Sequence, residues 1–471
     1  MIKKLKIHIL IKPHLLIISI IAILPLSKIF SQEIPAEFRA LQLRKLFLEI
    51  GNNWDDKTIF GPIRYDHKNI TSDSLMVNAR FGTRVFNNKK MLYGYGHFTF
   101  KKNYHGYLYP RIVDSPKQFY RYSGISRDIE RWGFTSGETD ISGISFQNDW
   151  MIFQFGRGRQ SWGAGNDIQL CLSENSNPYD YGLLDLDFGK LRVRYFHGYL
   201  ETDSLAYNRY ITGRGIEFNN GKYLIFGLSE VIIYSGKNRP IDFAYFNPMS
   251  THLEIELNDR QNNIGTGTGN GVWQLSVDYK PLEKIRLSGN YLFDEFTLDK
   301  QQTDGGKGSG RAFSIKSTYQ IFYNKQSILS CFASIITVGT NTFKHQDGNN
   351  NFVQRSKPLG WNIGSDSKET KIGLNGVYNN QLIVEIEYGI QELGENNFVN
   401  NAYSGYTDYS DGPFPSGMVE NVYFGSSRLQ WWVSSYFSVI TNLRYNYSNL
   451  DGNNLELNIG IDIFYPFNTT L

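Results

Sequence analysis

The sequence predicts an all-β protein, a transmembrane outer-membrane β-barrel of about 16–18 antiparallel strands with a short N-terminal periplasmic helical element. Three observations predict this fold. The 471 residues are 15% aromatic and only 20% charged, which excludes a disordered chain. Apolar and polar residues alternate with period two over most of the chain after residue 75, as in strands with two unlike faces. Short turns and long loops follow one another, as they do in outer-membrane barrels.

The N-terminus carries the pattern of an export signal. Four lysines precede the apolar run 15–26, and the small residue Ser31 follows a few positions later. This order predicts a secretory signal peptide over residues 1–31 and export through the Sec pathway to the cell outer membrane. Removal of these residues takes away five lysines and no acidic residue, which leaves 43 basic against 45 acidic residues, a net charge of −2. The charge therefore gives no indication of nucleic-acid binding.

Residues 32–75 differ from the rest and are expected to form a periplasmic helical or plug segment. Within 36–50, Phe38, Leu41 and Phe47 recur among charged residues at a spacing that fits one amphipathic helix ending at Gly51. The alternation of Leu41 and Leu43 with polar residues would also fit a strand. The helix is the favoured interpretation, placed at the periplasmic mouth of the barrel.

Residues 76–471 are expected to form the barrel itself. The stretches 273–279 and 455–465 alternate without interruption. A soluble β-sandwich alternates as well, but these strands run about 9–12 residues, near the length that crosses a membrane. Aromatic residues stand at strand ends, as at 431–432, where an interfacial girdle would lie. Turns such as 280–284 are short, and loops such as 340–368 are long.

The most unusual stretch is 150–165, a strand that runs into a Gly-rich bend carrying Arg157, Arg159 and Trp162. Guanidinium groups suit the carboxylates of acidic sugars, and an indole face suits the apolar face of a sugar ring. An equally weighted interpretation pairs the two arginines with acidic residues of neighbouring strands. The predicted polysaccharide-binding set is completed by Asp180, Arg209, Tyr210, Arg214, Asn247 and Arg260. Any one of these loops is more simply a surface turn, so the hypothesis rests on their clustering between 157 and 263.

Catalytic and metal-binding patterns are missing from the sequence. It contains no H-E-x-x-H, no G-x-S-x-G and no pair of histidines at zinc-ligand spacing. Asp185 and Asp187 resemble a D-x-D metal motif, but they stand in an alternating run, which favours two carboxylates facing the barrel lumen. We therefore expect no enzyme activity, no catalytic residue, no metal and no cofactor.

Several blocks together resemble the capsule-assembly Wzi family of outer-membrane proteins. They are the run 155–165, the turn 177–181, the strands at 191–198 and 227–230, and the segment 244–248, in matching order and spacing. The resemblance implies an 18-stranded barrel that holds secreted capsular polysaccharide at the cell surface as a lectin, without catalysis. The N-terminal segment is short for the enterobacterial members and no aromatic residue ends the chain. These departures suggest a distant branch such as that of Bacteroidetes, in which related barrels are associated with gliding or surface exopolysaccharide.

The leading hypothesis is thus a non-enzymatic barrel that binds and retains an anionic surface polysaccharide through outward-facing loops between about 157 and 263. Its expected partners are this polysaccharide, outer-membrane lipid and surface or gliding-machinery proteins. The alternatives are a porin-like channel for small solutes, and a component of gliding or surface-adhesion machinery. A barrel-borne hydrolase is disfavoured because no catalytic motif is present.

Overall fold

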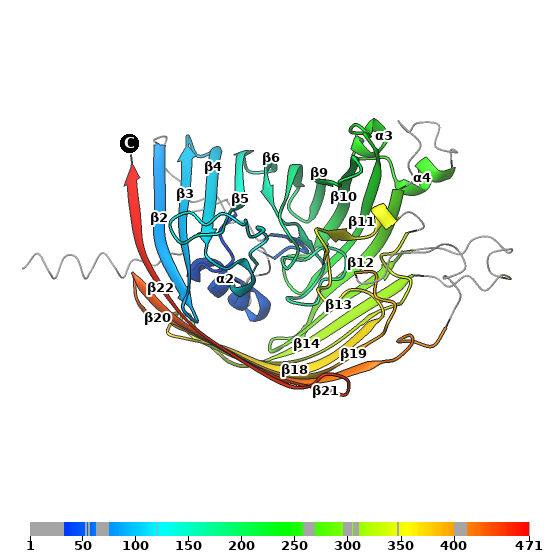
Figure 1. Cartoon of the computed structure of the whole chain (residues 1–471). Helices are drawn as coiled ribbons and strands as arrows, with labels where there is room; N and C mark the ends of the chain where they lie inside the picture. Colours follow the sequence, from blue (N-terminus) through cyan, green and yellow to red (C-terminus); the bar gives the residue numbers. More distant parts are fainter. Residues whose placement is uncertain are drawn as a thin grey trace, which may run out of the picture.

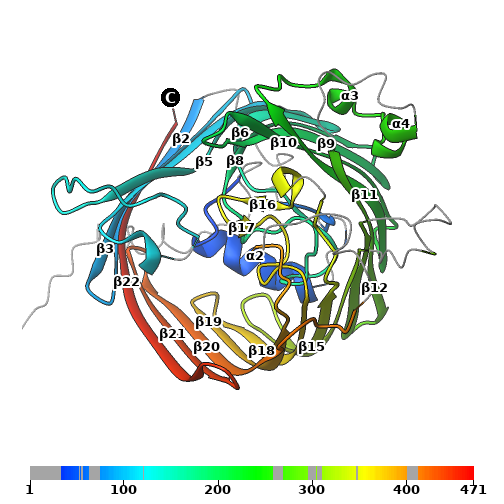
Figure 2. The ribbon, with the colours of Figure 1, turned by 45° about the vertical axis from the view of Figure 1, so that its right-hand side comes forward.

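The protein folds as a closed antiparallel β-barrel, which confirms the predicted fold class (Figures 1 and 2). The computed structural model describes residues 33–51, 54, 57–62, 75–119, 121–257, 269–294, 304, 310–345, 348–399 and 412–470. Within these ranges eighteen strands form the wall, the upper limit of the predicted number. The first wall strand, β2, pairs with the last, β22, so the sheet has no free edge. The expected signal peptide lies outside the described residues.

The wall strands follow the chain order, and each pairs with its neighbours in sequence. Their bounds are β2 Leu75–Phe86, β3 Lys89–Phe100, β4 Tyr104–Val113, β5 Ser136–Gln147, β6 Met151–Gly158, β8 Tyr179–Asp187, β9 Leu191–Thr202, β10 Tyr207–Asn219, β11 Leu224–Lys237, β12 Gly269–Leu282, β13 Ile285–Phe293, β14 Arg311–Tyr323, β15 Ile328–Val338, β18 Ser367–Tyr378, β19 Leu382–Leu393, β20 Glu420–Ser434, β21 Phe437–Ser448 and β22 Gly452–Thr470.

The sequence alternation becomes a difference between the two faces of the wall. In β14, Ser314 and Lys316 point inward and are buried, whereas Phe313, Ile315 and Tyr319 point outward and are exposed. The same pattern recurs around the barrel and produces an apolar outer surface, which suits lipid as its surroundings. No helix within the described ranges is long and apolar enough to cross a membrane.

The two ends of the barrel differ in the length of their connections. One end carries turns of two to four residues, such as 283–284 and 324–327, and the barrel's first and last strands also begin and end there. The other end carries the loops 114–135, 159–178 and 339–366, among others. By the usual arrangement of outer-membrane barrels, the short-turn end faces the periplasm and the long-loop end faces outward.

The interior of the barrel is occupied by protein, as Figure 2 shows for α2, β16 and β17. We call the described residues of 33–62, 159–178 and 339–366 the plug. The first segment carries helix α2, Arg39–Ile50, which ends at Gly51 within the stretch expected to be helical. The remaining short elements are β1 Phe60–Gly61, η1 Pro116–Gln118, β7 Ser161–Trp162, α3 Phe243–Phe246, α4 His252–Leu257, η2 Gly348–Asn350, β16 Val353–Gln354 and β17 Lys357–Pro358.

Two apolar clusters hold the plug against the wall. In the first, Phe60, Trp162 and Leu359 from three plug segments pack on inward-facing wall residues such as Phe196. In the second, Phe38, just before α2, and Leu46 of α2 lie among the inward-facing tyrosines of β3 and β4. The barrel thus has a core inside its wall, in addition to the apolar surface outside it.

Candidate functional site

Ion pairs inside the barrel tie the plug to the wall. Arg111 of β4 is fully buried, and its guanidinium lies 2.8 Å from Glu37 of the plug, 2.5 Å from Glu138 and 2.8 Å from Asp140. A buried charge is tolerated only when it is paired, so this cluster fixes the entry of the plug segment relative to β4 and β5.

Three of the predicted binding residues lie inside the barrel. Arg159 pairs with Asp140 at 2.7 Å and donates to the carbonyl oxygen of Ser176 at 2.6 Å. Trp162 is fully buried, with ring centroids 4.8 Å from Phe60 and 5.2 Å from Phe196. Both side chains hold loop 159–178 in the lumen, and Arg159 does so through an acidic residue of the wall, as in the interpretation that paired the arginines with acids of neighbouring strands. The indole of Trp162 presents no open face to the outside.

Arg209 holds the second plug loop, 339–366, inside the lumen. Its guanidinium pairs with Glu201 at 2.6 Å and donates to the carbonyl oxygens of Asn349 at 2.6 Å and Asn351 at 2.8 Å. The two loops also bond to each other, since the amide of Trp361 donates to Leu170. These contacts make the plug one body assembled from three distant segments.

Tyr210, Arg214 and Asn247 meet on the outer face of the wall. Tyr210 and Arg214 of β10 lie beneath residues 238–257, which carry α3 and α4 outside the strand ring, include Asn247, and which we call the wall cover (Figure 2). The Tyr210 hydroxyl donates to the carbonyl oxygen of Arg239 at 2.8 Å, and Arg214 donates to that of Asn247 at 3.2 Å. The three residues thus join the cover to the wall.

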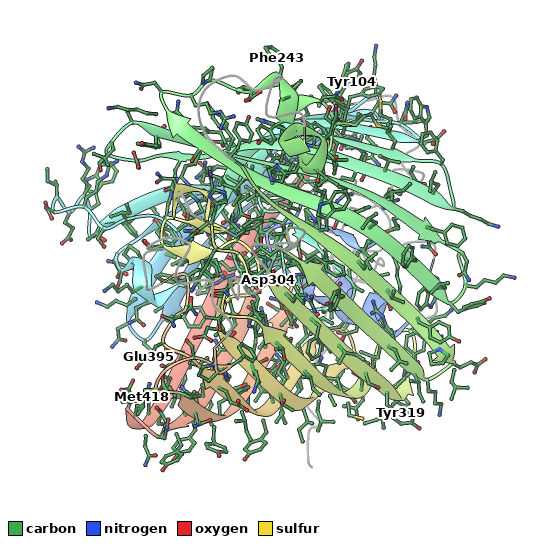
Figure 3. All side chains as sticks on the ribbon, turned by 90° about the vertical axis from the view of Figure 1, so that its right-hand side faces the viewer. Tyr104, Phe243, Asp304, Tyr319, Glu395 and Met418 are labelled. Carbon is green, nitrogen blue, oxygen red and sulfur yellow. The ribbon has the colours of Figure 1, made fainter. Side chains whose placement is uncertain are left out.

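A stack of aromatic rings and one ion pair complete this contact. Tyr234 lies between Tyr210 and Tyr245, with ring centroids 5.0 and 4.4 Å away. The Nε of Arg214 is 3.3 Å from the carboxylate of Glu230 on the neighbouring strand. The opposite side of the cover is apolar and exposed, as Phe243 shows at the outer edge of the molecule (Figure 3).

The remaining three predicted residues are elsewhere. Arg157 and Asp180 form an ion pair at 3.1 Å between β6 and β8, on the outer face towards the long-loop end, where Asp180 is largely exposed. Arg260 lies outside the described residues. The structure therefore distributes the eight described members of the predicted set among the lumen, the contact between the wall and its cover, and the outer rim, instead of gathering them into one surface.

A different loop exposes the residue types expected of a glycan site. Residues 125–132, between β4 and β5, are all exposed and include Arg127, Arg131 and Trp132. The Trp132 side chain is 96% exposed. In Figure 2 this loop reaches away from the strand ring. Neither arginine has an ion-pair partner among the described residues, so both guanidinium groups are available to a ligand.

Backbone geometry holds Trp132 in this position. The amides of Arg131 and Phe134 donate to each other's carbonyl oxygens at 2.9 and 3.0 Å, and Trp132 and Gly133 both have positive φ, 53° and 79°. A bulky residue in the left-handed region costs about 1–2 kcal/mol. The sequence could have indicated this residue, because Trp132 stands between Arg131 and Gly133 in a stretch without apolar–polar alternation. Such a tryptophan cannot be assigned to either face of a strand.

One carboxylate connects this loop to the interior. Glu174 of the plug pairs with Arg121 of the β4–β5 loop at 3.0 Å and with Lys45 of α2. Burial favours the neutral acid, but the two positive charges outweigh it and lower the pKa of Glu174 to about 2. The carboxylate is therefore ionised at any physiological pH and joins three segments.

The two carboxylates of the D-x-D motif each form an ion pair with an arginine of β9. Asp185 pairs with Arg194, and Asp187 with Arg192. Both carboxylates face the lumen, in agreement with the favoured interpretation of the D-x-D motif. Among the described residues no group of three His, Cys, Asp or Glu side chains is arranged to hold a metal ion.

Comparison with known proteins identifies solved structures with a similar fold. No family model and no curated protein matches the chain. Among solved structures, the chain is similar to Wzi of Escherichia coli, described as a carbohydrate-binding β-barrel involved in group 1 capsule assembly. The identity is 12%, the match covers 84% of this chain and 85% of Wzi, and the TM-score is 0.55. OprD of Pseudomonas aeruginosa matches at 9% identity over 84% of this chain and 95% of its own, with a TM-score of 0.43. The likeness to Wzi shows an outer-membrane barrel fold.

Proposed function

We propose that this protein is a non-enzymatic outer-membrane barrel that binds and retains an anionic surface polysaccharide at its outer end, and so contributes to capsule or exopolysaccharide assembly. The observation that carries the proposal is a lumen filled by the plug together with an exposed Arg–Trp loop at the long-loop end. A barrel whose interior is packed with its own loops suits surface binding better than passage of solutes. The carbohydrate binding described for Wzi, a protein of the same fold, supports this direction.

The proposed contacts follow from the chemistry of the exposed loop. Trp132 offers an open indole face to the apolar side of a sugar ring, and Arg127 and Arg131 offer forked donors to uronate carboxylates. Arg157 and Asp180, at the outer rim, are proposed as secondary contacts, and Arg260 stays a contact predicted from the sequence. Arg159, Trp162 and Arg209 act as positioning residues that hold the plug inside the lumen.

The proposal is tested in a deletion strain by measuring cell-bound and released polysaccharide. We expect normal synthesis with release into the medium, and restoration of retention by the wild-type gene. The triple variant R127Q/R131Q/W132A should restore retention poorly, although it folds, because all three side chains are exposed. The matched control D128N/E130Q changes the same loop without removing a cation or the indole.

Binding by the purified protein gives a second readout. Exposed guanidinium–carboxylate pairs are screened by salt, so the affinity for an acidic glycan should fall as ionic strength rises from about 0.05 to 0.5 M. Retention by the triple variant equal to wild type, or glycan binding that ignores salt, would refute the assignment to this loop.

A channel remains the second candidate because one stretch of the lumen face is accessible to water. Inward-facing Glu385 and Arg428, 3.5 Å apart on β19 and β20, and Glu387 beside them are each roughly a third exposed. A line of hydrated charges is what a solute path would require. Steady conductance of the wild-type protein in planar bilayers would favour the channel, and a closed trace would favour retention.

A further inference from the structure

The wall cover, residues 238–257, lies over a polar patch on the outer face of the wall. Four side chains form this patch, and each is at most 9% exposed: His197 of β9, Thr212 and Arg214 of β10, and Glu230 of β11. They are neighbours, because His197 pairs with Thr212 and Arg214 pairs with Glu230 in the ladders of these strands. Such residues are unusual on the outer face of a membrane barrel, where lipid-facing side chains are apolar.

The cover is held on this part of the wall by specific contacts. The amide of His252 donates to the carboxylate of Glu230 at 3.0 Å. The ring of Phe246 lies beside that of His197, with centroids 5.5 Å apart, and the carbonyl oxygen of Phe246 accepts from the Tyr195 hydroxyl at 2.6 Å. The cover thus supplies partners to polar side chains that the wall alone would turn outward.

The patch lies at a height of the wall that is needed to cross the membrane. β10 runs from Tyr207 at the outer end to Asn219 at the periplasmic end, and Arg214 lies near its middle. A tilted strand needs about 9–11 residues to cross the bilayer, and this length, counted from the periplasmic end, includes Arg214. On the same face below it, Ile216 and Phe218 are apolar and exposed, as lipid-facing residues are. Without the cover, Arg214 would stand in hydrocarbon, which is destabilising.

The cover has its charges inside and its apolar side chains outside. The ion pair of Arg239 and Asp242, at 2.7 Å, is buried. Among the side chains described in the cover, Glu254 is the only charged one that is exposed. Five large apolar side chains are between 47% and 82% exposed, and Figure 3 shows the first of the two phenylalanines at the outer edge of the molecule: Ile241, Phe243, Phe246, Met249 and Leu253. This order suits apolar surroundings and not water.

The apolar side of the cover continues into the lipid-facing surface of the wall. Phe246 contacts Tyr195 near the middle of β9, and Val193 is the next residue on the same face towards the periplasm. Val193 pairs with Ile216 of β10, which is exposed below the cover. The cover and the wall beneath it therefore face the same medium.

We propose that the wall cover is embedded in the outer leaflet of the outer membrane, where its apolar side binds the acyl chains of outer-leaflet lipids. The polar patch at membrane depth and the exposed apolar side of the cover both lead to this position. A protein partner would have to displace lipid halfway down the wall to reach the same side, so lipid is the occupant that the position favours. No residue of the exposed Arg–Trp loop enters the inference, which is therefore independent of glycan binding.

Spin labels on single cysteines test this in phosphatidylethanolamine–phosphatidylglycerol vesicles. The full-length protein carries C331S, and the remaining Cys171 is buried, so C331S alone is the labelling blank. Each label reports its accessibility to oxygen, which enters hydrocarbon, and to a polar nickel chelate, which hydrocarbon excludes. The test position is M249C, and I315C on the outer face of β14 is the lipid reference. I125C is the matched water reference, because Ile125 is 80% exposed and Met249 is 82% exposed.

We expect the oxygen-to-nickel ratio at M249C to equal that at I315C within about twofold and to exceed that at I125C by about tenfold or more. L253C on α4 should agree, and it keeps the test valid if M249C fails to fold. A ratio at M249C and L253C equal to that at I125C would place the cover in water and overturn the proposal. Low accessibility to both reagents would also overturn it, because a protein would then cover this side.

Discussion

Replacement of Trp162 by alanine tests whether the plug is a packed body or a loosely held set of loops. The side chain is fully buried between Phe60 and Phe196, and its backbone amide donates to Leu172 at 3.1 Å. Truncation of a buried tryptophan costs about 3–5 kcal/mol through lost contacts and the cavity left behind. None of the wall's strand pairings involves Trp162, so this loss should fall on the plug and leave the barrel closed.

The assay combines limited proteolysis of loops 159–178 and 339–366 with conductance in planar bilayers. At about 4 kcal/mol, the population of opened plug rises on the order of a thousandfold, so cleavage should accelerate and current steps should begin. W150A is the control, because Trp150 is half-exposed on the outer face beside Phe188. Unchanged protection and a closed trace in folded W162A would refute the idea that this packing holds the plug.

Three further predictions concern charges. Because the pKa of Glu174 is lowered, its ion pairs stabilise the folded plug by at most about 3 kcal/mol above pH 4.5, and this stabilisation is lost as the pH falls towards 2. Protection of loop 159–178 from an acid protease should fall over the same pH range in wild type, and E174Q should abolish this pH dependence. An identical pH course in both proteins would contradict the assignment. R209Q should expose loop 339–366 to proteolysis at neutral pH, because it removes the ion pair with Glu201 and the donors to the carbonyl oxygens of Asn349 and Asn351, at a cost of about 2–3 kcal/mol. Wild-type protection of the loop in R209Q would exclude this role. R214M should lower the melting temperature and loosen the wall cover, because it leaves the buried carboxylate of Glu230 without its ion-pair partner. The double variant R214M/E230L should restore the melting temperature. A double variant no more stable than R214M would argue against a stabilising Arg214–Glu230 ion pair.

The wall could be predicted from the sequence because its pattern is local. A strand shows its two faces in every second residue, so the alternation of 273–279 or 455–465 is sufficient to place β12 and β22. The strand number follows from repeating that unit along the chain. Closure of the barrel adds no sequence signal of its own, but it is the arrangement that leaves no unpaired edge.

The plug could not be predicted in the same way, because its contacts join residues far apart in the chain. Asn290 accepts a bond from the amide of Ala164 at 2.7 Å across 126 positions. The contact between loop 159–178 and Asn290 also explains why the bend is rich in glycine. Gly163 has φ +136°, and a Cβ there would stand 2.9 Å from the Asn290 side chain. A Gly-rich bend that suggested a ligand loop is therefore a close approach of the plug to the wall.

The arginines show the same limit at the level of a single residue. Alternation indicates that Arg209 and Tyr210 point to opposite faces, but it does not state which face is the lumen. In the structure Arg209 holds a loop inside the barrel and Tyr210 packs under the wall cover outside it. Residue type alone suggested one glycan surface for both.

The plug also ties an outer loop to the wall through helix α2. Glu174 joins Arg121 of the β4–β5 loop to Lys45 of α2, and one turn further along the helix Glu49 pairs with Lys316 of β14 at 2.5 Å. Neighbouring turns of one helix are thus held by a long loop and by a wall strand. Because a buried charge is destabilising once its partner moves away, a change in the β4–β5 loop would act on the seating of the helix and not on that loop alone.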